Sequence, residues 1–356
     1  MIIRSLKLVN YRSYSNKTFN FDEKLNILVG KNAQGKTNVI EAIFYAVIGR
    51  SFKTSKEKEV IKWGEHKAYI GGEFSKKYRD FKIELFFDEN KKKSIKIDDI
   101  SIHKIGELMG TSNAVFFSPD ELKLVKDSPE ERRRFMNIDI SQTNKKYFYY
   151  LGRYEKVLAN RNKLLKSTKD IDVVKETIEI WDRALSELAE KIVCERKKFI
   201  EELTPYAKLA HQYISEGKEN IEVKYISSFE GENYQEKMYK ALQKNLEKDF
   251  KLGFTTIGPH RDELDIFLNG TEVKNFGSQG QQRTVALSLK LAELEIIKNR
   301  VGEYPILLLD DVFSELDSYR RKKLLKFTSK TQTIITCTEF KEKIDGKIIE
   351  IVKENQ

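Results

Sequence analysis

An eight-residue loop near the start of the chain constrains the fold more than any other segment. Residues 30–37 read Gly-Lys-Asn-Ala-Gln-Gly-Lys-Thr and match the phosphate-loop pattern G-x-x-x-x-G-K-[ST]. The apolar run 25–29 predicts a buried strand before the loop, and residues 38–47 predict an apolar helix after it. In this order the backbone N–H groups turn inward at a helix N-terminus, where anions bind. The sequence therefore predicts a nucleotide-binding α/β core.

All eight loop residues are candidate nucleotide contacts, and two of them have specific expected roles. Lys36 is expected to reach the β- and γ-phosphates and to take part in catalysis, and the Thr37 hydroxyl is expected to ligate Mg²⁺. ATP and Mg²⁺ are therefore the predicted cofactors. The other candidate contacts in the loop are Gly30, Lys31, Asn32, Ala33, Gln34 and Gly35.

Composition limits the class of protein. A chain of 356 residues with 40% hydrophobic residues predicts one large domain and a second lobe. No apolar run approaches the ~18–20 residues that span a bilayer, and residues 1–9 alternate like a strand, so we expect a cytoplasmic protein without a membrane partner. Two cysteines and four histidines argue against structural zinc and a disulfide framework. A net charge of +10 suits a polyanionic partner such as nucleic acid.

A second motif supplies carboxylates. Residues 306–309 are Ile-Leu-Leu-Leu, which predicts a central parallel strand, and Asp310 and Asp311 follow at its C-terminal edge, where ligands bind in α/β sheets. This pattern is typical of a Walker B strand. Asp310 is expected to hold Mg²⁺ directly or through water, and Asp311 is expected to orient or deprotonate the attacking water. Glutamate is commoner at the second position, so the shorter Asp311 predicts slow hydrolysis.

Two further segments resemble motifs of ABC-type ATPases. Residues 278–283, Ser-Gln-Gly-Gln-Gln-Arg, resemble the signature loop, in which Ser278, Gly280 and Gln281 would contact the γ-phosphate held by the opposite subunit. Asp317 ends a segment spaced like a D-loop, which crosses the dimer interface. The alternatives are a simple helix cap at Ser278 and a charged turn at 314–317. Thr336-Cys337-Thr338 stands where a switch histidine is common, and no Q-loop glutamine is evident.

Taken together, these motifs resemble the RecF family of bacterial recombination mediators, within the ABC/SMC-like ATPases. The resemblance covers essentially the whole chain. It implies an α/β fold: an ABC-type ATPase head with a mixed sheet around the phosphate loop, made from residues 1–128 and 250–356, and a mainly helical arm inserted at 129–249. It also makes Arg12 a candidate nucleotide contact, with a surface arginine as the alternative. Further segments that carry the resemblance are 11–14, 117–120, 127–129, 132–135 and 258–262.

The resemblance also implies a function. It implies an ATP-dependent homodimer that binds duplex DNA and single-strand gap junctions, with slow, DNA-stimulated ATP hydrolysis. It implies that the protein helps to load the strand-exchange recombinase together with RecR and RecO, and that it supports replication and SOS induction. Whether the weak ATPase activity makes the protein an enzyme in the usual sense stays open.

The residues that would contact DNA are less well defined. Candidates are Lys53, Lys56, Arg132 to Arg134, Arg161 and Lys163, with solvated helix faces as the alternative. His260 and Arg261 could line the nucleotide or the dimer seam, or could form a structural turn.

Three other functions are alternatives. A nucleotide-binding subunit of an ABC transporter is the main alternative, although its signature loop usually follows the phosphate loop much sooner than residue 278. A structural SMC-like clamp would need longer arms. A nuclease centre would need an additional acidic cluster, and the sequence shows none.

Overall fold

The computed structural model describes residues 1–340 and 345–352, and it divides into two compact units. The first unit consists of residues 1–122, 206–219 and 283–356, and the second unit consists of residues 123–205 and 220–282. The borders predicted for an ATPase head and a helical arm, after residues 128 and 249, differ from those of the compact units. They stay a prediction of functional domains.

A five-stranded parallel sheet carries the phosphate loop in the first unit. Its strand order is β14-β3-β13-β12-β8, and every neighbouring pair is parallel. All residues of β12 and β13 are buried, as expected for parallel strands covered on both faces. The strands are β3 (Leu25–Val29), β8 (Ala114–Phe117), β12 (Ile306–Asp310), β13 (Thr333–Cys337) and β14 (Lys347–Glu350).

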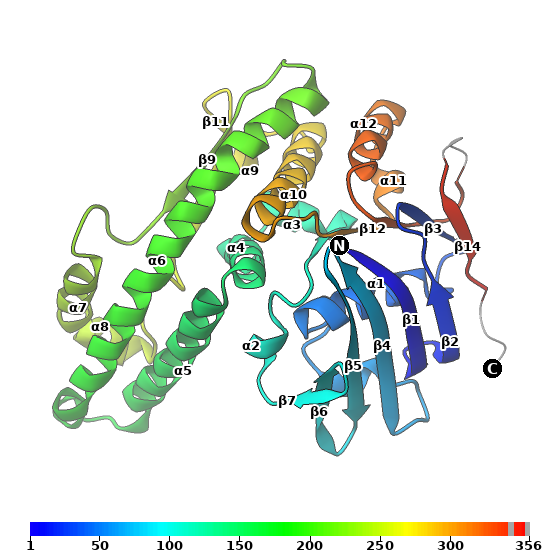
Figure 1. Cartoon of the computed structure of the whole chain (residues 1–356). Helices are drawn as coiled ribbons and strands as arrows, with labels where there is room; N and C mark the ends of the chain where they lie inside the picture. The colour runs from blue at the N-terminus through cyan, green and yellow to red at the C-terminus, as the bar shows by residue number, and fades with distance from the viewer. Residues whose placement is uncertain (341–344, 353–356) are drawn as a thin grey trace. The chain divides into compact units, whose positions relative to one another are not determined.

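A separate six-stranded antiparallel sheet completes the first unit, with the order β2-β1-β4-β5-β6-β7 (Figure 1). Residues 68–74, 81–87 and 93–98 alternate with period two, which predicts antiparallel hairpins, and this sheet contains them. Parallel and antiparallel strands do not share one mixed sheet. The strands are β1 (Ile2–Tyr11), β2 (Tyr14–Asn20), β4 (Lys67–Lys76), β5 (Arg79–Asp88), β6 (Lys91–Ile97) and β7 (Ile100–Ile102).

Helix α1 (Lys36–Ile48) joins the two sheets. It contacts β12 and β13 of the parallel sheet and β4 and β5 of the antiparallel sheet. Because it is covered from both directions, it is apolar almost all round and nearly all of its residues are buried. The remaining short elements of this unit are η1 (Glu57–Val60), α2 (Ile105–Leu108), η2 (Pro119–Leu122), α11 (Val312–Glu315) and α12 (Ser318–Thr328).

The second unit is mostly helical and contains a small antiparallel sheet of order β11-β10-β9. The sequence predicts a strand at residues 221–226 and a hairpin turn at Asn269-Gly270. Strand β9 (Ile221–Ile226) and the hairpin of β10 (Glu263–Leu268) with β11 (Thr271–Glu272) confirm both predictions. Two long helices contribute residues to both units: α6 (Ile171–Ser215) and α10 (Gln279–Val301). The other helices are α3 (Lys123–Lys126), α4 (Pro129–Thr143), α5 (Lys145–Ser167), α7 (Tyr234–Lys244), α8 (Leu246–Leu252) and α9 (Val273–Phe276).

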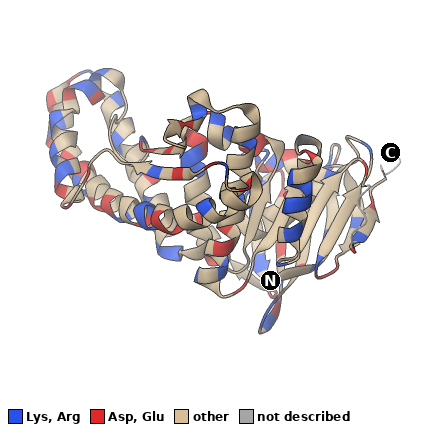
Figure 2. Cartoon of the chain, turned by 90° about the horizontal axis from the view of Figure 1, so that it is seen from above, with Lys and Arg blue, Asp and Glu red and all other residues tan. Residues whose placement is uncertain are grey.

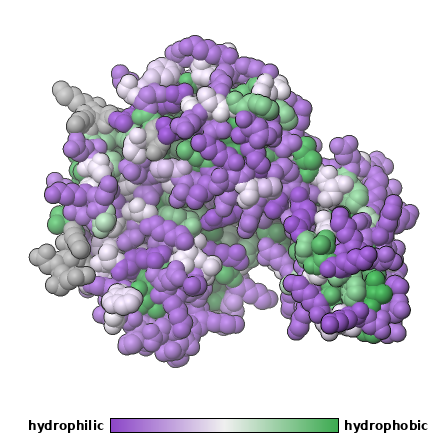
Figure 3. All heavy atoms as spheres, turned by 180° about the vertical axis from the view of Figure 1, so that it is seen from behind, coloured by the Kyte–Doolittle hydropathy of each residue, from purple (hydrophilic) through white to green (hydrophobic). Residues whose placement is uncertain are grey.

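The surface is rich in charge. Lysine and arginine alternate with acidic residues along the helices (Figure 2), and the face seen in Figure 3 is mainly hydrophilic. Within residues 1–340 and 345–352, no helix is long and apolar enough to cross a bilayer.

Candidate nucleotide-binding site

The phosphate loop connects β3 to α1 through a glycine that no other residue could replace without strain. Gly35 has φ +102° and caps the N-terminus of α1. A Cβ atom added there would lie 2.7 Å from Ser13 Oγ and 2.9 Å from the Tyr14 hydroxyl oxygen. At Gly30 an added Cβ atom would lie 2.5 Å from the carbonyl oxygen of Ile351. The loop is therefore a close-fitting cradle with room for backbone only.

Lys36 is folded back over this cradle. Its Nζ donates to the carbonyl oxygens of Gly30 and of Lys31, the latter at 2.9 Å. The side chain is 7% exposed, so the ammonium group is held at the loop and away from bulk water. Such a held cation beside the N-terminus of α1 suits a phosphate group.

The Walker B carboxylate lies directly beside the loop. Thr37 Oγ1 donates to Asp310 Oδ1 at 2.9 Å, although 273 positions separate the two residues. Thr336 Oγ1 donates to the same oxygen at 2.7 Å, because β12 and β13 pair Asp310 with Thr336. The structure thus brings together Lys36, Thr37 and Asp310, which the sequence nominated separately.

The charge of Asp310 is poorly compensated in this arrangement. Burial raises the pKa of its carboxyl group, and hydrogen bonds from Thr336 and Thr37 together with the charge of Lys53 oppose the shift. One carboxylate oxygen and one hydroxyl oxygen are the hard ligands that Mg²⁺ prefers. The residues present therefore fit a magnesium ion, which would also compensate the buried charge.

Asp311 occupies a strained position at the end of β12. Its backbone is left-handed, with φ +51°, and its N–H donates to Thr336 Oγ1 at 2.9 Å. Ser314 Oγ donates to its carbonyl oxygen at 2.7 Å. The single hydroxyl of Thr336 thus fixes the Asp310 side chain and the Asp311 backbone. The sequence pointed to Thr336 only as the residue in place of a switch histidine.

Arg12 is engaged within the first unit. Its Nε and Nη2 donate to the two carboxylate oxygens of Glu41, at 3.0 and 2.7 Å, and its Nη1 donates to the carbonyl oxygen of Glu59 at 2.6 Å. Glu41 lies on α1 and is fully buried. Arg12 therefore tethers the β1–β2 turn to the phosphate-loop helix, and its contact with nucleotide stays a prediction. The sequence did not predict this role of Glu41, because a single acidic residue within an apolar helix belongs to no recognisable motif.

The signature segment lies at the start of α10, in the second unit. Gln281 N–H donates to Ser278 Oγ at 3.3 Å, and Ser278 N–H donates to Gln281 Oε1 at 2.8 Å. This reciprocal pair is a capping box, so helix capping at Ser278 is real. Gly280 lies within the same first turn. A role of these three residues toward a second subunit's nucleotide stays a prediction.

Asp317 likewise caps a helix. Its carboxylate accepts from the Arg320 N–H at 2.8 Å, at the start of α12, and also pairs with the Arg320 guanidinium. Hydrogen bonding to this backbone N–H is the main cause that lowers the pKa of Asp317, so the group is firmly ionised. The D-loop role of Asp317 is compatible with this cap and stays a prediction.

For two of the arginines that the sequence suggested as DNA contacts, the prediction is wrong. Arg132 is 2% exposed and makes a bidentate ion pair with Glu263, at 2.6 and 2.8 Å. Arg161 is fully buried between Asp182 and Asp249, at 2.6 and 2.7 Å. Both hold the second unit together, and a basic residue in a sequence does not reveal that it has a buried acidic partner.

The contacts of His260 favour a structural role in a turn over a role at the nucleotide or the dimer seam. Tyr154 shares a hydrogen bond with His260 Nδ1 at 2.7 Å, and the other ring nitrogen bonds to the Thr255 carbonyl oxygen at 3.1 Å. Burial lowers the pKa of His260 to about 4, so the ring is neutral at physiological pH. The neighbouring Arg261 guanidinium lies 5.0 Å from the ring centre of Phe254.

Comparison with known sequences gives a consistent result over the whole chain. A family model described as the RecF/RecN/SMC N terminal domain matches residues 2–353. The DNA replication and repair protein RecF of Clostridium novyi is 45% identical over 352 residues, which cover 98% of this chain and 97% of that protein. The protein of the same name from Clostridium perfringens is 47% identical over 339 residues, which cover 95% and 93%.

Solved structures agree with the sequence comparison. The recombination mediator protein RecF-ATPrS in the RecFOR pathway superposes with a TM-score of 0.91 and 36% identity, covering 99% of this chain and 96% of that one. An Smc head domain from Pyrococcus furiosus superposes with a TM-score of 0.55 and 18% identity, covering 95% and 89%. The second similarity is one of fold alone, that of an Smc head domain.

Proposed function

Because this chain belongs to the RecF proteins of the RecF/RecN/SMC N-terminal domain family, we propose that it is an ATP-binding protein of DNA replication and repair. We propose further that ATP drives it to dimerise and that the dimer acts on DNA at single-strand gap junctions. The single observation that carries the nucleotide part is the contact of Thr37 with Asp310, which joins the phosphate loop to the Walker B strand.

The phosphate loop would hold ATP through residues that are already arranged for it. Backbone N–H groups of residues 30–37 would face the phosphates, and Lys36 would exchange its two carbonyl partners for phosphate oxygens. Thr37 and Asp310 would ligate Mg²⁺, which when bound would neutralise charge on the phosphates. The RecF structures named with ATP and its analogue support ATP as the nucleotide.

Asp311 would then orient the attacking water and accept its proton. It is partly exposed, directly follows the buried Asp310, and is held in its left-handed conformation by Thr336 and Ser314. The side chain of aspartate is shorter than that of the glutamate that is commoner at this position, so we expect slow hydrolysis. The rate of hydrolysis would then set the lifetime of the dimer.

Dimerisation would follow from a shared site. Ser278, Gly280 and Gln281 of one subunit would meet the γ-phosphate held by Lys36 of the other, with Asp317 at the interface. A ligand that binds only the dimer stabilises the dimer by mass action, and its hydrolysis removes that stabilisation. The helix N-terminus at Gln279 supplies a partial positive charge for this contact.

DNA and protein partners complete the proposal. A net charge of +10 suits DNA. The remaining candidate phosphate contacts are Lys53, Lys56, Arg133, Arg134 and Lys163. The RecFOR pathway named with the solved relative supports RecO and RecR as partners in loading the strand-exchange recombinase. Support of SOS induction would follow from that loading.

A nucleotide-binding subunit of an ABC transporter is the weaker alternative. The RecF relatives match over 95–98% of this chain, including the part between the phosphate loop and the signature segment.

Light-scattering mass with and without ATP–Mg²⁺ tests this proposal, first alone and then with a gapped DNA duplex. We expect a shift from monomer to dimer with ATP and tighter DNA binding by the dimer. Lys36→Ala should stay monomeric, Asp311→Asn should remain a dimer after wild-type protein has dissociated, and Lys24→Ala, just before β3, should behave as wild type. Normal ATP-driven dimerisation of Lys36→Ala would refute the shared site.

A further inference from the structure

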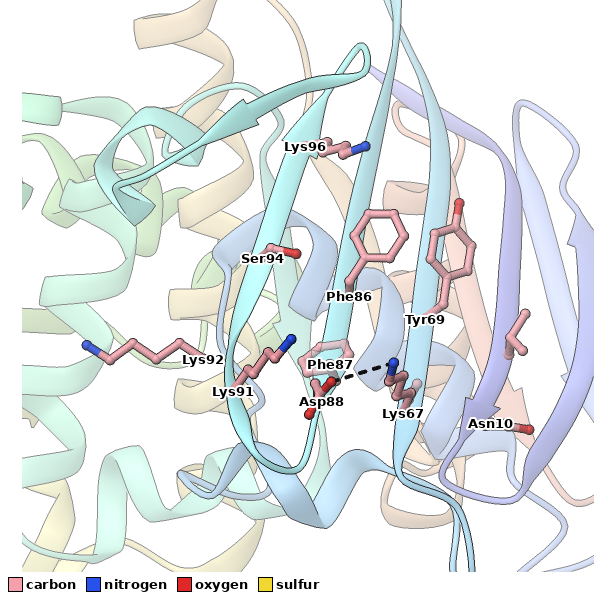
Figure 4. A pocket seen from close by; sticks show the side chains of 12 residues that line it. Asn10, Lys67, Tyr69, Phe86, Phe87, Asp88, Lys91, Lys92, Ser94 and Lys96 are labelled. Carbon is pink, nitrogen blue, oxygen red and sulfur yellow. Dashed lines mark ion pairs between the residues drawn. The ribbon is translucent and has the colours of Figure 1, made fainter.

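The antiparallel sheet of the first unit carries a trough that the nucleotide site does not use. The trough has a volume of about 500 Å³ and lies on β1, β4, β5 and β6 (Figure 4). Aromatic and basic side chains dominate it.

Two aromatic rings lie side by side in this trough. Tyr69 on β4 and Phe86 on β5 are directly opposite in the strand register, and their ring centres are 5.1 Å apart. The Tyr69 ring lies over Gly71, where an added Cβ would come within 2.3 Å of the phenol oxygen. Both rings are partly exposed, unlike Phe87, whose side chain is buried. Pleating thus presents one aromatic pair to solvent.

Lysines surround the rings. Lys67, Lys91, Lys92 and Lys96 line the trough against a single carboxylate, Asp88, which pairs with Lys67 at 3.8 Å. Lys96 Nζ lies 5.5 Å from the ring centre of Phe86. Figure 4 shows Lys96 on one side of the rings and Lys67 with Lys91 on the other.

Glu84, a neighbouring acid, and Lys93, the remaining lysine of the run, each have an ion-pair partner outside the lining. Glu84 accepts from the Tyr69 hydroxyl at 2.6 Å and pairs with Lys82 at 2.7 Å, which fixes the Tyr69 ring. Lys93, between two lining residues, pairs instead with Glu57 and contacts the Tyr45 ring. The trough therefore keeps an excess of positive charge around an ordered aromatic pair.

We propose that this trough binds single-stranded DNA, with bases stacked on Phe86 and Tyr69 and backbone phosphates on the surrounding lysines. Exposed aromatic faces between basic residues suit unpaired bases, whose π-faces are free, whereas the bases of a duplex are already stacked. The inference rests on the proposed function, because it assigns the single-stranded side of a gap junction to a surface distinct from the nucleotide site.

A tryptophan follows a segment that is bonded to a lining residue of the trough. The Lys62 N–H donates to the carbonyl oxygen of Asn10, a lining residue, at 2.8 Å, and Trp63 follows with 99% of its surface exposed. An indole ring with so much exposed surface suits stacking on a further base. It also supplies a fluorescent reporter, since the chain contains only two tryptophans.

The test uses the full-length protein and a fluorescein-labelled oligothymidylate of thirty nucleotides, without ATP. Phe86→Leu keeps an apolar side chain but removes the ring, and it should weaken oligothymidylate binding about tenfold. Tyr69→Leu removes the second ring and should also weaken oligothymidylate binding. Phe86→Tyr restores a ring and should restore affinity. Quenching of Trp63 fluorescence should accompany binding in every variant that binds.

Salt dependence tests the phosphate contacts. The double variant Lys91→Gln, Lys96→Gln should weaken binding and reduce the slope of log affinity against log salt by about 1.4, since each single-strand phosphate contact contributes ~0.7. Lys77→Gln, in the turn between β4 and β5, is the matched control and should leave the slope unchanged.

These results test the trough proposal separately from the proposed function. Unchanged oligothymidylate binding by Phe86→Leu would overturn the trough proposal. An equal loss of affinity of this variant for duplex and for single-stranded DNA would also overturn it. If wild type dimerises with ATP and binds gapped duplex but not oligothymidylate, the trough proposal fails and the proposed function stands. If the protein binds oligothymidylate tightly but does not dimerise with ATP, the trough proposal stands and the proposed function fails.

Discussion

At the scale of single residues, the nucleotide site places a carboxylate where ionisation is unfavourable. Asp310 is 8% exposed and has two hydroxyl donors but no adjacent ammonium group within hydrogen-bond distance among the described residues. An uncompensated buried carboxylate is typical of a site for a divalent cation, because the negative charge that binds the ion destabilises the protein when no ion is bound.

Replacing Asp310 by Asn should therefore stabilise the nucleotide-free protein, by roughly 0.5–2 kcal/mol, while removing the extra thermal stability that ATP–Mg²⁺ confers. The native pKa of Asp310 lies above the unfolded one, so its unfavourable contribution is absent below the unfolded pKa and complete above the native pKa. The difference between the melting temperatures of variant and wild type should shrink as pH falls through that interval. A lower melting temperature for the variant at pH 7 would contradict this account.

Arg12→Ala should destabilise the protein even without nucleotide. The substitution leaves the buried Glu41 carboxylate without its bidentate partner, which commonly costs about 3–5 kcal/mol. Urea unfolding measures the effect. Arg4→Ala, at an exposed arginine of β1, should change stability by less than ~0.5 kcal/mol. If Arg12→Ala unfolds like wild type but binds ATP poorly, Arg12 is a nucleotide contact rather than a tether.

At the scale of elements, the start of α10 combines a helix cap with a proposed contact across the dimer. Ser278→Ala should cost about 1 kcal/mol by loss of the cap, whereas Ser278→Asp should keep wild-type stability, since Asp is an equally good N-cap. Both variants should fail to dimerise with ATP, the second because its charge would face the γ-phosphate. Melting temperature and light-scattering mass separate the two roles. Normal ATP-driven dimerisation of Ser278→Asp would leave capping as the sole role.

Elements defined by local patterns were predictable from the sequence. The phosphate loop, the apolar strand before Asp310, the hairpin at Asn269 and Gly270 and the alternating antiparallel strands all follow from short-range periodicity and turn chemistry. What could not be predicted depends on distant pairing. The segregation of strands into two sheets, the capture of Arg161 by two acids and the bond of Thr336 to both aspartates join residues far apart in sequence.

At the scale of the whole molecule, the proposed dimer should be visible in the salt dependence of DNA binding. Released counterions scale with phosphate contacts, so a dimer should show about twice the slope of a monomer in log affinity against log salt. Fluorescence anisotropy with a gapped duplex between 50 and 200 mM salt measures both slopes. Lys36→Ala provides the control that should keep the shallower slope when ATP is added. Equal slopes for wild type with and without ATP would show that the two states use the same contacts.

The strand order of the parallel sheet also determines when the protein can fold during its synthesis. Neither β3 nor β8 pairs with the other, and each requires a strand from beyond residue 305. The phosphate loop, which ends at Thr37, is therefore synthesised about 300 residues before the end of β13 at Cys337, the strand that joins β3 to the rest of the sheet. At ~5–20 residues per second this is a wait of roughly 15–60 s. During that interval the antiparallel sheet, whose strands all lie within residues 2–102, is the part of the first unit that can form by itself. A nascent chain cut short before β12 would thus carry the whole phosphate-loop motif without a nucleotide site.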